Sequence, residues 1–278
     1  MVFKPTSSKN IATTNPWWAK IHLSIPLLLI FHFSFFIFHS CGLDIEDPTP
    51  PSPPVWVQKS FPEEWPERGI DAHESGGGIY LEWETLVESE IKKLHIYRAQ
   101  YFDVEDSLGS YDSILQLEVE GITSSEWVDT QIETDVRYFY KLKSEDDANN
   151  LSSFSDPVSY RILRSVNSEN SIPNGISSFL PSDRTLSWIY FFSIEMENYC
   201  VTVLSRGGEF ILREIVLPGN YVGDTEQYTI PENILFEPSE IYKWRIDIGA
   251  KYLEGIETAG SESAWATFMY KGDSLNTP

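Results

Sequence analysis

Hydrophobic and polar residues alternate with a period of two in many short runs between residues 55 and 271. In one such run, Tyr138, Tyr140 and Leu142 occupy every second position. A period of two is typical of a strand that buries one side. The runs are separated by Gly, Pro, Asn and Asp, which favour turns. The chain is therefore predicted to be all-β.

Seven strand-like runs are predicted in the first half of this region. They cover residues 56–57, 79–83, 94–98, 114–119, 126–129, 138–144 and 158–163. Seven short strands with turn residues between them fit an antiparallel β-sandwich.

One pattern occurs twice in the chain. Trp83, in Leu-Glu-Trp, is followed 55 residues later by Tyr138, and Trp188, in Leu-Ser-Trp, is followed 54 residues later by Tyr242. The tryptophans lie 105 residues apart and the tyrosines 104. A repeat of this length matches a whole small domain. We therefore expect two tandem seven-stranded sandwiches.

Several spaced motifs of the first unit occur together. They are Leu81-x-Trp83, Tyr97-Arg98, Asp129-Thr130, Tyr138-x-Tyr140-x-Leu142-x-Ser144 and the loop of residues 145–150 before Ser155. With this spacing the unit resembles a fibronectin type III domain. The second unit, with its Trp188 and Tyr242 strands, resembles the same family. The resemblance implies an immunoglobulin-like sandwich, a tyrosine corner at Tyr138 and a left-handed turn at Asn149.

These patterns divide the chain into six segments. They are a signal peptide or membrane anchor (1–40), a Pro-rich tether (41–54), the first domain (55–164), a linker (165–172), the second domain (173–271) and a tail (272–278).

The charge of the chain limits its partners. The formal net charge is −22, and all acidic residues follow position 40, so that the remainder has 17 basic and 42 acidic residues. Such a surface repels phosphate backbones and anionic lipid headgroups. Nucleic acid is therefore not expected as a partner. The acidic surface serves either solubility or a specific contact.

The N-terminal segment is predicted to be a targeting signal. Residues 1–20 contain three lysines and no acid, and residues 21–38 are nearly all apolar. Cys41 follows the small residue Ser40, which resembles the lipobox of bacterial lipoproteins, although Phe38 and His39 depart from it. The resemblance implies lipidation of Cys41. An uncleaved membrane-spanning helix and ordinary cleavage with release are the alternatives.

A spacer is predicted directly after this segment. Five of the eleven residues 44–54 are proline. Proline-rich chains adopt extended polyproline II at about 3.1 Å per residue, so this segment spans roughly 35–40 Å.

The sequence shows no catalytic or metal-binding motif. Only His73 and His95 follow the N-terminal segment, and neither lies in a ligand spacing typical of zinc. The loop Glu145-Asp146-Asp147 could contact Ca²⁺, but it also fits a solvated turn. Cys200 lies within a strand-like run and is predicted to be buried. We therefore expect no enzyme, no metal and no cofactor.

Two groups of neighbouring aromatic residues are candidates for ligand contact. They are Tyr101-Phe102 in the first domain and Tyr190-Phe191-Phe192 in the second. Aromatic rings in loops of a sandwich suit sugar rings or protein pockets. The alternative is that each group extends a core strand.

Together these features predict a lipoprotein of the cell envelope, outside the cytoplasm, at the outer membrane or cell surface. It would be anchored to the membrane by an N-terminal lipid or helix and would act as a non-catalytic spacer or interaction module. Its partner would be an unknown protein or a glycan. The alternative function is that of a surface carbohydrate-binding accessory protein.

Overall fold

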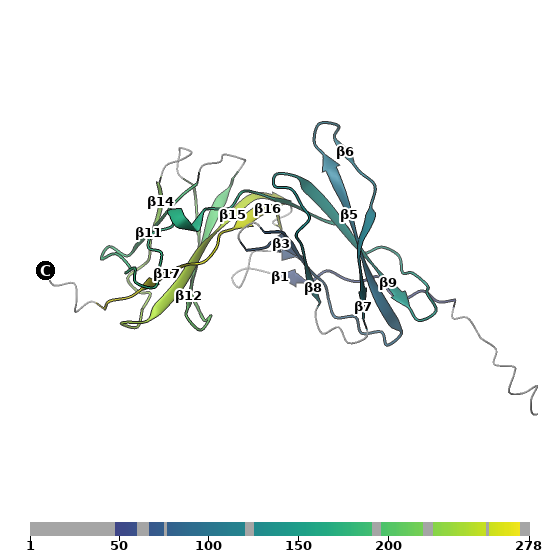
Figure 1. Cartoon of the computed structure of the whole chain (residues 1–278), viewed down its shortest axis with the longest axis horizontal. Helices are drawn as coiled ribbons and strands as arrows, with labels where there is room; N and C mark the ends of the chain where they lie inside the picture. Colours follow the sequence, from purple (N-terminus) through teal and green to yellow (C-terminus); the bar gives the residue numbers. More distant parts are fainter. Residues whose placement is uncertain are drawn as a thin grey trace, which may run out of the picture. The chain divides into compact units, whose positions relative to one another are not determined.

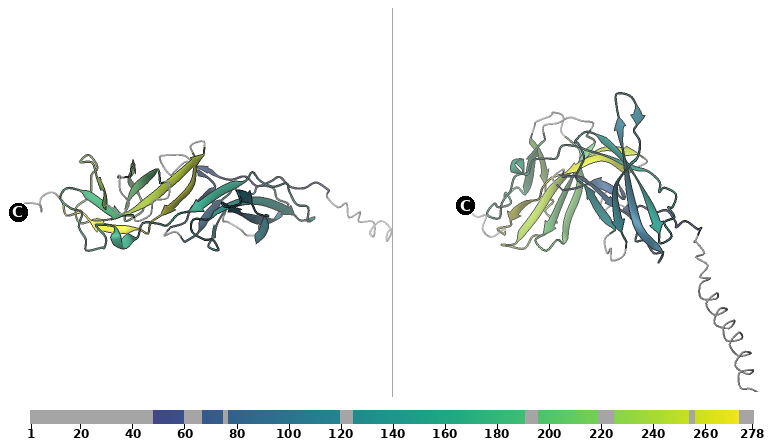
Figure 2. Two further views of the ribbon diagram at one scale, coloured as in Figure 1. Left: turned by 90° about the horizontal axis from the view of Figure 1, so that it is seen from above. Right: turned by 45° about the vertical axis from the view of Figure 1, so that its right-hand side comes forward.

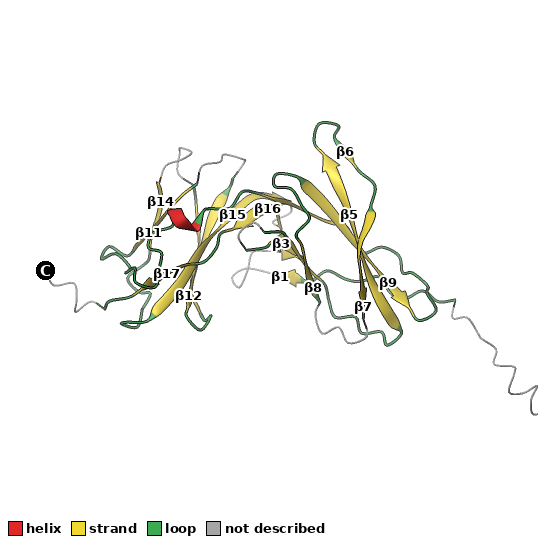
Figure 3. Ribbon diagram, viewed as in Figure 1, coloured by secondary structure: helices red, strands yellow, loops and turns green. Residues whose placement is uncertain are grey.

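A computed structural model describes residues 48–59, 67–74, 77–119, 125–190, 196–218, 225–253 and 256–272. These residues belong to one compact unit, Pro48–Pro278. About half of them lie in strands, and the single helix among them is the short 3₁₀ helix η1 (Ser168–Asn170), as Figures 1 and 3 show. No helix in the described part of the chain is long and apolar enough to cross a membrane. The all-β prediction is confirmed.

The first sandwich consists of two antiparallel sheets. The three-stranded sheet has the order β3 (Ile70–Ala72), β4 (Ile79–Glu82), β8 (Glu126–Asp129). The second sheet has the order β10 (Val158–Ile162), β9 (Arg137–Asp146), β5 (Ile91–Phe102), β7 (Asp112–Glu118). Two short hairpins are added, β1 (Gln58–Lys59) with β2 (Glu67–Arg68) and the end of β5 with β6 (Ser107–Leu108). Three strands therefore face four across one core.

The second sandwich repeats this arrangement. One sheet pairs β11 (Thr185–Ile189) with β14 (Thr225–Thr229). The other has the order β13 (Phe210–Val216), β12 (Asn198–Ser205), β15 (Ile241–Leu253). Two successive strands, β16 (Ile256–Glu262) and β17 (Ala266–Met269), pair with different parts of β15. The views in Figure 2 show both sandwiches from other sides.

Each sandwich has its own core, and the repeated residues belong to these cores. Trp83 and Tyr140 lie in the first core, and Trp188 and Trp244 lie in the second. Trp188 is fully buried and packs edge-on against Tyr199 with ring centres 5.2 Å apart. The repeated pattern is therefore a feature of packing.

Both sandwiches contain a tyrosine corner. The hydroxyl of Tyr138 accepts a hydrogen bond from the backbone N–H of Glu133 at 3.2 Å, and that of Tyr242 accepts one from Glu237 at 2.7 Å. In each case the donor lies five residues upstream, as in sandwiches of this kind. Asn149 has a φ of 65°, in the left-handed region. The predicted corner at Tyr138 and the turn at Asn149 are confirmed.

Removing the hydroxyl of Tyr242 should destabilise the second sandwich. We expect Tyr242→Phe to lower the free energy of unfolding by about 1 kcal/mol, because one intramolecular hydrogen bond is lost. Urea denaturation measures the change. Tyr228→Phe is the control, since no side-chain hydrogen bond of the described residues involves the Tyr228 hydroxyl. Equal free energies of unfolding for the two variants would show that the hydrogen bond of the Tyr242 hydroxyl does not stabilise the sandwich.

The predicted first strand at residues 56–57 is only a single antiparallel bridge, with Val57 N–H donating to the Glu82 carbonyl oxygen and Glu84 N–H to that of Val55. Trp56 forms only an isolated bridge with Trp83, and the strand beside β4 is β3. The Trp56 side chain is buried, and its Nε1–H donates to the carbonyl oxygen of Asp156 at 2.8 Å. The sequence missed β3 because three residues are too few to show a period.

The two sandwiches are joined by strand pairing as well as by the chain. Strand β16 of the second sandwich lies parallel to β10 of the first, with Arg161 opposite Ala259 and Ile162 opposite Gly260. The larger sheets of the two sandwiches thus form one hydrogen-bonded sheet of ten strands in the described residues. The chain between them also packs, because Val166 is buried in the second core. The junction is an ordered part of the fold.

Candidate functional site: a charged pocket between the sandwiches

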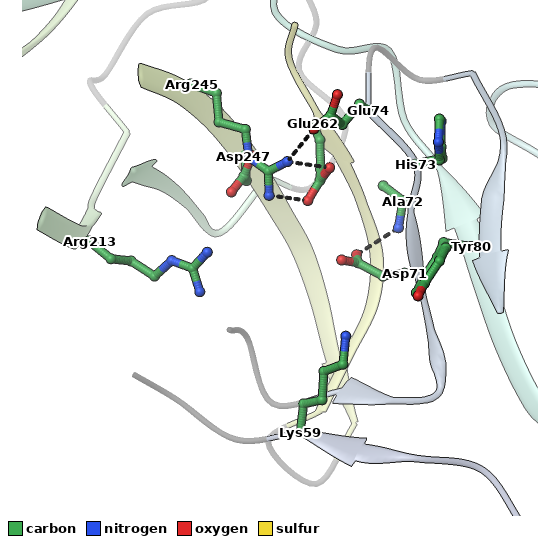
Figure 4. A pocket seen from close by; sticks show the side chains of 10 residues that line it. All are labelled: Lys59, Asp71, Ala72, His73, Glu74, Tyr80, Arg213, Arg245, Asp247 and Glu262. Carbon is green, nitrogen blue, oxygen red and sulfur yellow. Dashed lines mark hydrogen bonds and ion pairs between the residues drawn. The ribbon is translucent and has the colours of Figure 1, made fainter. Parts of the chain in front are cut away.

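A pocket of about 280 Å³ lies where the two sandwiches meet. Its lining is almost entirely charged or polar (Figure 4). The first sandwich contributes Lys59, Asp71, Ala72, His73, Glu74 and Tyr80, and the second contributes Arg213, Arg245, Asp247 and Glu262. Both halves of the repeat are therefore needed to form it.

The alternation of β15 places the central charges. Trp244, Ile246 and Ile248 point into the second core, so Arg245 and Asp247 lie on the opposite face. Strand β16 places Glu262 directly opposite Asp247. An isolated bridge pairs Glu262 with Glu74 of the first sandwich. Carboxylates from both sandwiches thus gather around one guanidinium.

Arg245 binds three carboxylates. Its Nη1 lies 2.6 Å from Oε2 of Glu262, and its Nη2 contacts the other oxygen of the same carboxylate. Its Nε lies 2.9 Å from Oδ1 of Asp247, and its Nη1 lies 3.7 Å from Oε1 of Glu74. The side chain is 12% exposed, and its guanidinium lies 4.9 Å from the centre of the Trp265 ring. A planar fork with several donors suits this bidentate geometry.

Burial changes the proton affinities in this cluster. Burial raises the pKa of Asp247 to about 6, against the opposing effect of Arg245. It also raises the pKa of Glu262 well above its usual range, and the Asp247 charge adds to this rise. Burial alone would lower the pKa of Arg245, but Asp247 and Glu262 raise it. Arg245 therefore stays charged, while the Asp247 carboxyl group takes up a proton at mildly acidic pH.

The pH dependence of stability should reflect Asp247. Its pKa is higher in the folded state, so the stabilisation from its proton is fully present below pH 3.8 and is lost as the pH rises through about 6. From pH 4 to pH 7 we expect this group to remove up to about 3 kcal/mol, at about 1.4 kcal/mol per pKa unit. Urea denaturation at both pH values measures this loss. Asp247→Asn should reduce it, and an unchanged pH slope in this variant would contradict the assignment.

Two further carboxylates of the pocket accept hydrogen bonds from side chains next to it. Trp265 Nε1–H donates to Oε1 of Glu74 at 2.7 Å, and the Tyr160 hydroxyl donates to Oδ1 of Asp71 at 3.2 Å. In the described part of the chain, no group of three His, Cys, Asp or Glu side chains is arranged to hold a metal. These ion pairs and hydrogen bonds indicate a stable interface between the two sandwiches.

The predicted ligand contacts are only partly exposed. Tyr190 is 5% exposed, lies in the second core and packs edge-on against Tyr199. The prediction of a ligand contact is wrong for Tyr190, which is a core residue. Phe191, Phe192 and Cys41 lie outside the described residues.

The other predicted group lies at the end of β5. Phe102 is 43% exposed. Tyr101 is partly exposed, and its hydroxyl bonds to the carboxylate of Asp106. Both side chains of the group thus reach the surface of the first sandwich.

The remaining predicted positions are structural. Cys200 is buried and free, and burial raises the pKa of its thiol to about 12. His95 Nε2 lies 2.7 Å from Oε2 of Glu145. Asp146 accepts hydrogen bonds from the backbone N–H and the Nδ2–H of Asn150 at 2.8 and 2.9 Å. These two carboxylates therefore bind within the fold, as expected for the turn alternative to a Ca²⁺ site.

Sequence reasoning missed the Arg245 cluster. The available signal was the pair Arg245 and Asp247, two opposite charges in a strand whose other face is fully apolar.

Known proteins share little sequence with this chain. No family model matches the chain, and no curated protein matches it. Among solved structures, the chain is similar to the FN1-FN3 domains of chicken CNTN1 at 14% identity, over 80% of this chain and 69% of that chain, with a TM-score of 0.29. A match at that score carries no argument. The assignment of two fibronectin type III-like sandwiches rests on their strand order and their two tyrosine corners.

Proposed function

We propose that this protein is a membrane-anchored lipoprotein of the cell envelope, in which two coupled sandwiches form a non-catalytic spacer and protein-interaction module. The spacer role is supported by the ordered junction between the two sandwiches. A spacer transmits position only if its domains do not bend freely, and a short flexible linker would allow bending. The β10–β16 pairing and the buried Arg245 cluster oppose such bending.

The anchor is supported by the sequence. Cys41 follows an apolar segment and precedes a proline-rich stretch of the length needed for a tether. Lipid on Cys41 would tether the first sandwich through the residues before Ser52, whose carbonyl oxygen already accepts a hydrogen bond from the Ser144 hydroxyl at 2.6 Å. An acidic folded region would not itself adhere to anionic headgroups.

Intact mass and lipid labelling test the anchor. We expect the mature protein to begin at Cys41 and to incorporate a labelled fatty acid, and we expect Cys41→Ala to abolish the label. Cys200→Ala is the matched control, because its thiol is buried and should not affect labelling. A mature mass that still contains residues 1–40 would exclude lipidation at Cys41.

Spin labels on the full chain test the spacer. Ser113 and Glu232 are exposed, one in each sandwich, and each can be replaced by a labelled cysteine. We expect one narrow distribution of distances between the two labels. A broad distribution in the unaltered junction would contradict a rigid spacer.

A further inference from the structure

A second cavity lies within the first sandwich and shares no residue with the junction pocket. Its volume is about 550 Å³, within the range of small-molecule sites. It is formed by the end of β5, the start of β7 and the loop that follows β8. Its apolar wall continues the core of the first sandwich, because Tyr138 belongs to that core and Ile114 and Ile132 pack against it.

The floor of the cavity is held in place by Arg98. Its Nη1 donates to Oδ2 of Asp129 and to the carbonyl oxygen of Gln131, both at 2.7 Å. Its guanidinium lies 5.1 Å from the centre of the Tyr138 ring. Asp129 is buried and also accepts a hydrogen bond from the Tyr140 hydroxyl at 2.9 Å. The loop that carries Gln131 is thus fixed before any ligand arrives.

The rim carries an exposed aromatic ring that lies close to the backbone at Gly109. Phe102 is 43% exposed and lines the cavity. Gly109 donates its N–H to the carbonyl oxygen of Gln100 at 2.9 Å, which closes the hairpin beside the ring. A Cβ at Gly109 would lie only 3.2 Å from Cε2 of Phe102 and from the Gln100 carbonyl oxygen. The absence of a side chain at Gly109 therefore lets the ring lie close against the backbone.

The polar groups of the cavity combine donors and acceptors. Carboxamides of Gln100 and Gln131 line it, together with carboxylates of Asp112 and Glu133. Within the described ranges, no hydrogen bond or ion pair engages either carboxylate, and both residues are exposed. Carboxylates accept hydrogen bonds from hydroxyl groups, and carboxamides both donate and accept hydrogen bonds. This combination suits neighbouring hydroxyl groups, whereas the two carboxylates disfavour an anionic ligand.

We propose that this cavity binds neutral carbohydrate, with the Phe102 ring stacked on a sugar ring and with Gln100, Gln131, Asp112 and Glu133 bonded to its hydroxyl groups. An apolar sugar face pairs with an aromatic ring, and the hydroxyl groups at its edge need a polar wall. The proposal goes beyond the protein-interaction role proposed above, because it adds a carbohydrate site within the first sandwich. A lysine-rich peptide, attracted by the same carboxylates, is the competing ligand.

Binding of the full chain to a microarray tests the ligand class. The array holds neutral, carboxylated and sulfated oligosaccharides and a lysine-rich peptide. We expect binding to neutral oligosaccharides, confirmed in solution by calorimetry with the strongest of them. Binding only to the peptide, only to anionic sugars or to nothing would overturn the proposal.

Matched variants test the site. Phe102→Ala should weaken binding of the selected oligosaccharide at least tenfold, and Gly109→Ala should weaken it by displacing the ring. Phe179→Ala is the control, since Phe179 is equally exposed at 42% but lies in the second sandwich. Affinity unchanged in Phe102→Ala would overturn the proposal, as would an equal loss in Phe179→Ala. Neither result would alter Cys41 lipidation or the distance between spin labels, so failure here is separable from failure of the spacer proposal.

Discussion

Replacing Arg245 with methionine should destabilise the protein by about 3–5 kcal/mol, the usual effect of removing one partner from a buried ion pair. The carboxylates of Asp247 and Glu262 would remain buried without their cation. Their side chains are 5% and 12% exposed, so water could not replace the guanidinium without opening the junction. Urea denaturation measures the loss, and the spin-label distances should broaden.

Two further variants sharpen this result. Arg206→Met makes the same change at an exposed turn residue and should alter the free energy of unfolding by less than about 0.5 kcal/mol. Arg245→Met combined with Asp247→Leu and Glu262→Met removes all three charges, and we expect it to recover most of the lost stability, because apolar groups can replace a buried ion cluster. Equal stability of Arg245→Met and Arg206→Met would show that the cluster is solvated.

The fold could be predicted from the sequence because its information is local. A strand that buries one face must place apolar residues at every second position, as Tyr138, Tyr140 and Leu142 do. The tyrosine corner is local too, since its donor lies five residues from its acceptor. These features do not depend on how the two sandwiches meet.

The junction could not be predicted in this way. Arg245 and Asp247 lie on the polar face of β15, and an alternating strand alone assigns such a face to solvent. Their environment depends on Glu262 and on Glu74, which precedes Arg245 by 171 residues. Strand β16 itself has little apolar alternation, so its pairing with β10 leaves no periodic signal.

The two groups of aromatic residues show how far the two-residue period of a strand predicts which side chains are buried. Leu186, Trp188 and Tyr190 occupy every second position, and all three are buried. Continuing the period would have assigned Tyr190 to the core. For Phe102 the two-residue period does not predict burial or exposure, because β5 ends at this residue and the chain turns into the hairpin with β6. Its exposure depends on the close approach of Gly109, which is a contact across that hairpin.

Truncation of the two repeated tryptophans should show whether the sandwiches unfold together. Trp188→Ala and Trp83→Ala should each lower the free energy of unfolding by about 3–5 kcal/mol, as expected for a buried aromatic side chain. Trp188 is 0% exposed and Trp83 is 3% exposed, and they lie in separate cores. Two independent domains would show two calorimetric transitions, and each variant would lower only one of them.

The shared sheet predicts a different result. Because β16 pairs with β10, loss of the second sandwich exposes an edge of the first and removes the carboxylates and guanidinium that meet Glu74. We therefore expect one transition in the unaltered protein, lowered to a similar extent by either variant. Adding Arg245→Met to Trp188→Ala should separate the transitions, leaving the first sandwich to melt at the higher temperature. Two transitions in the unaltered protein would show that the junction contributes too little free energy to couple the sandwiches.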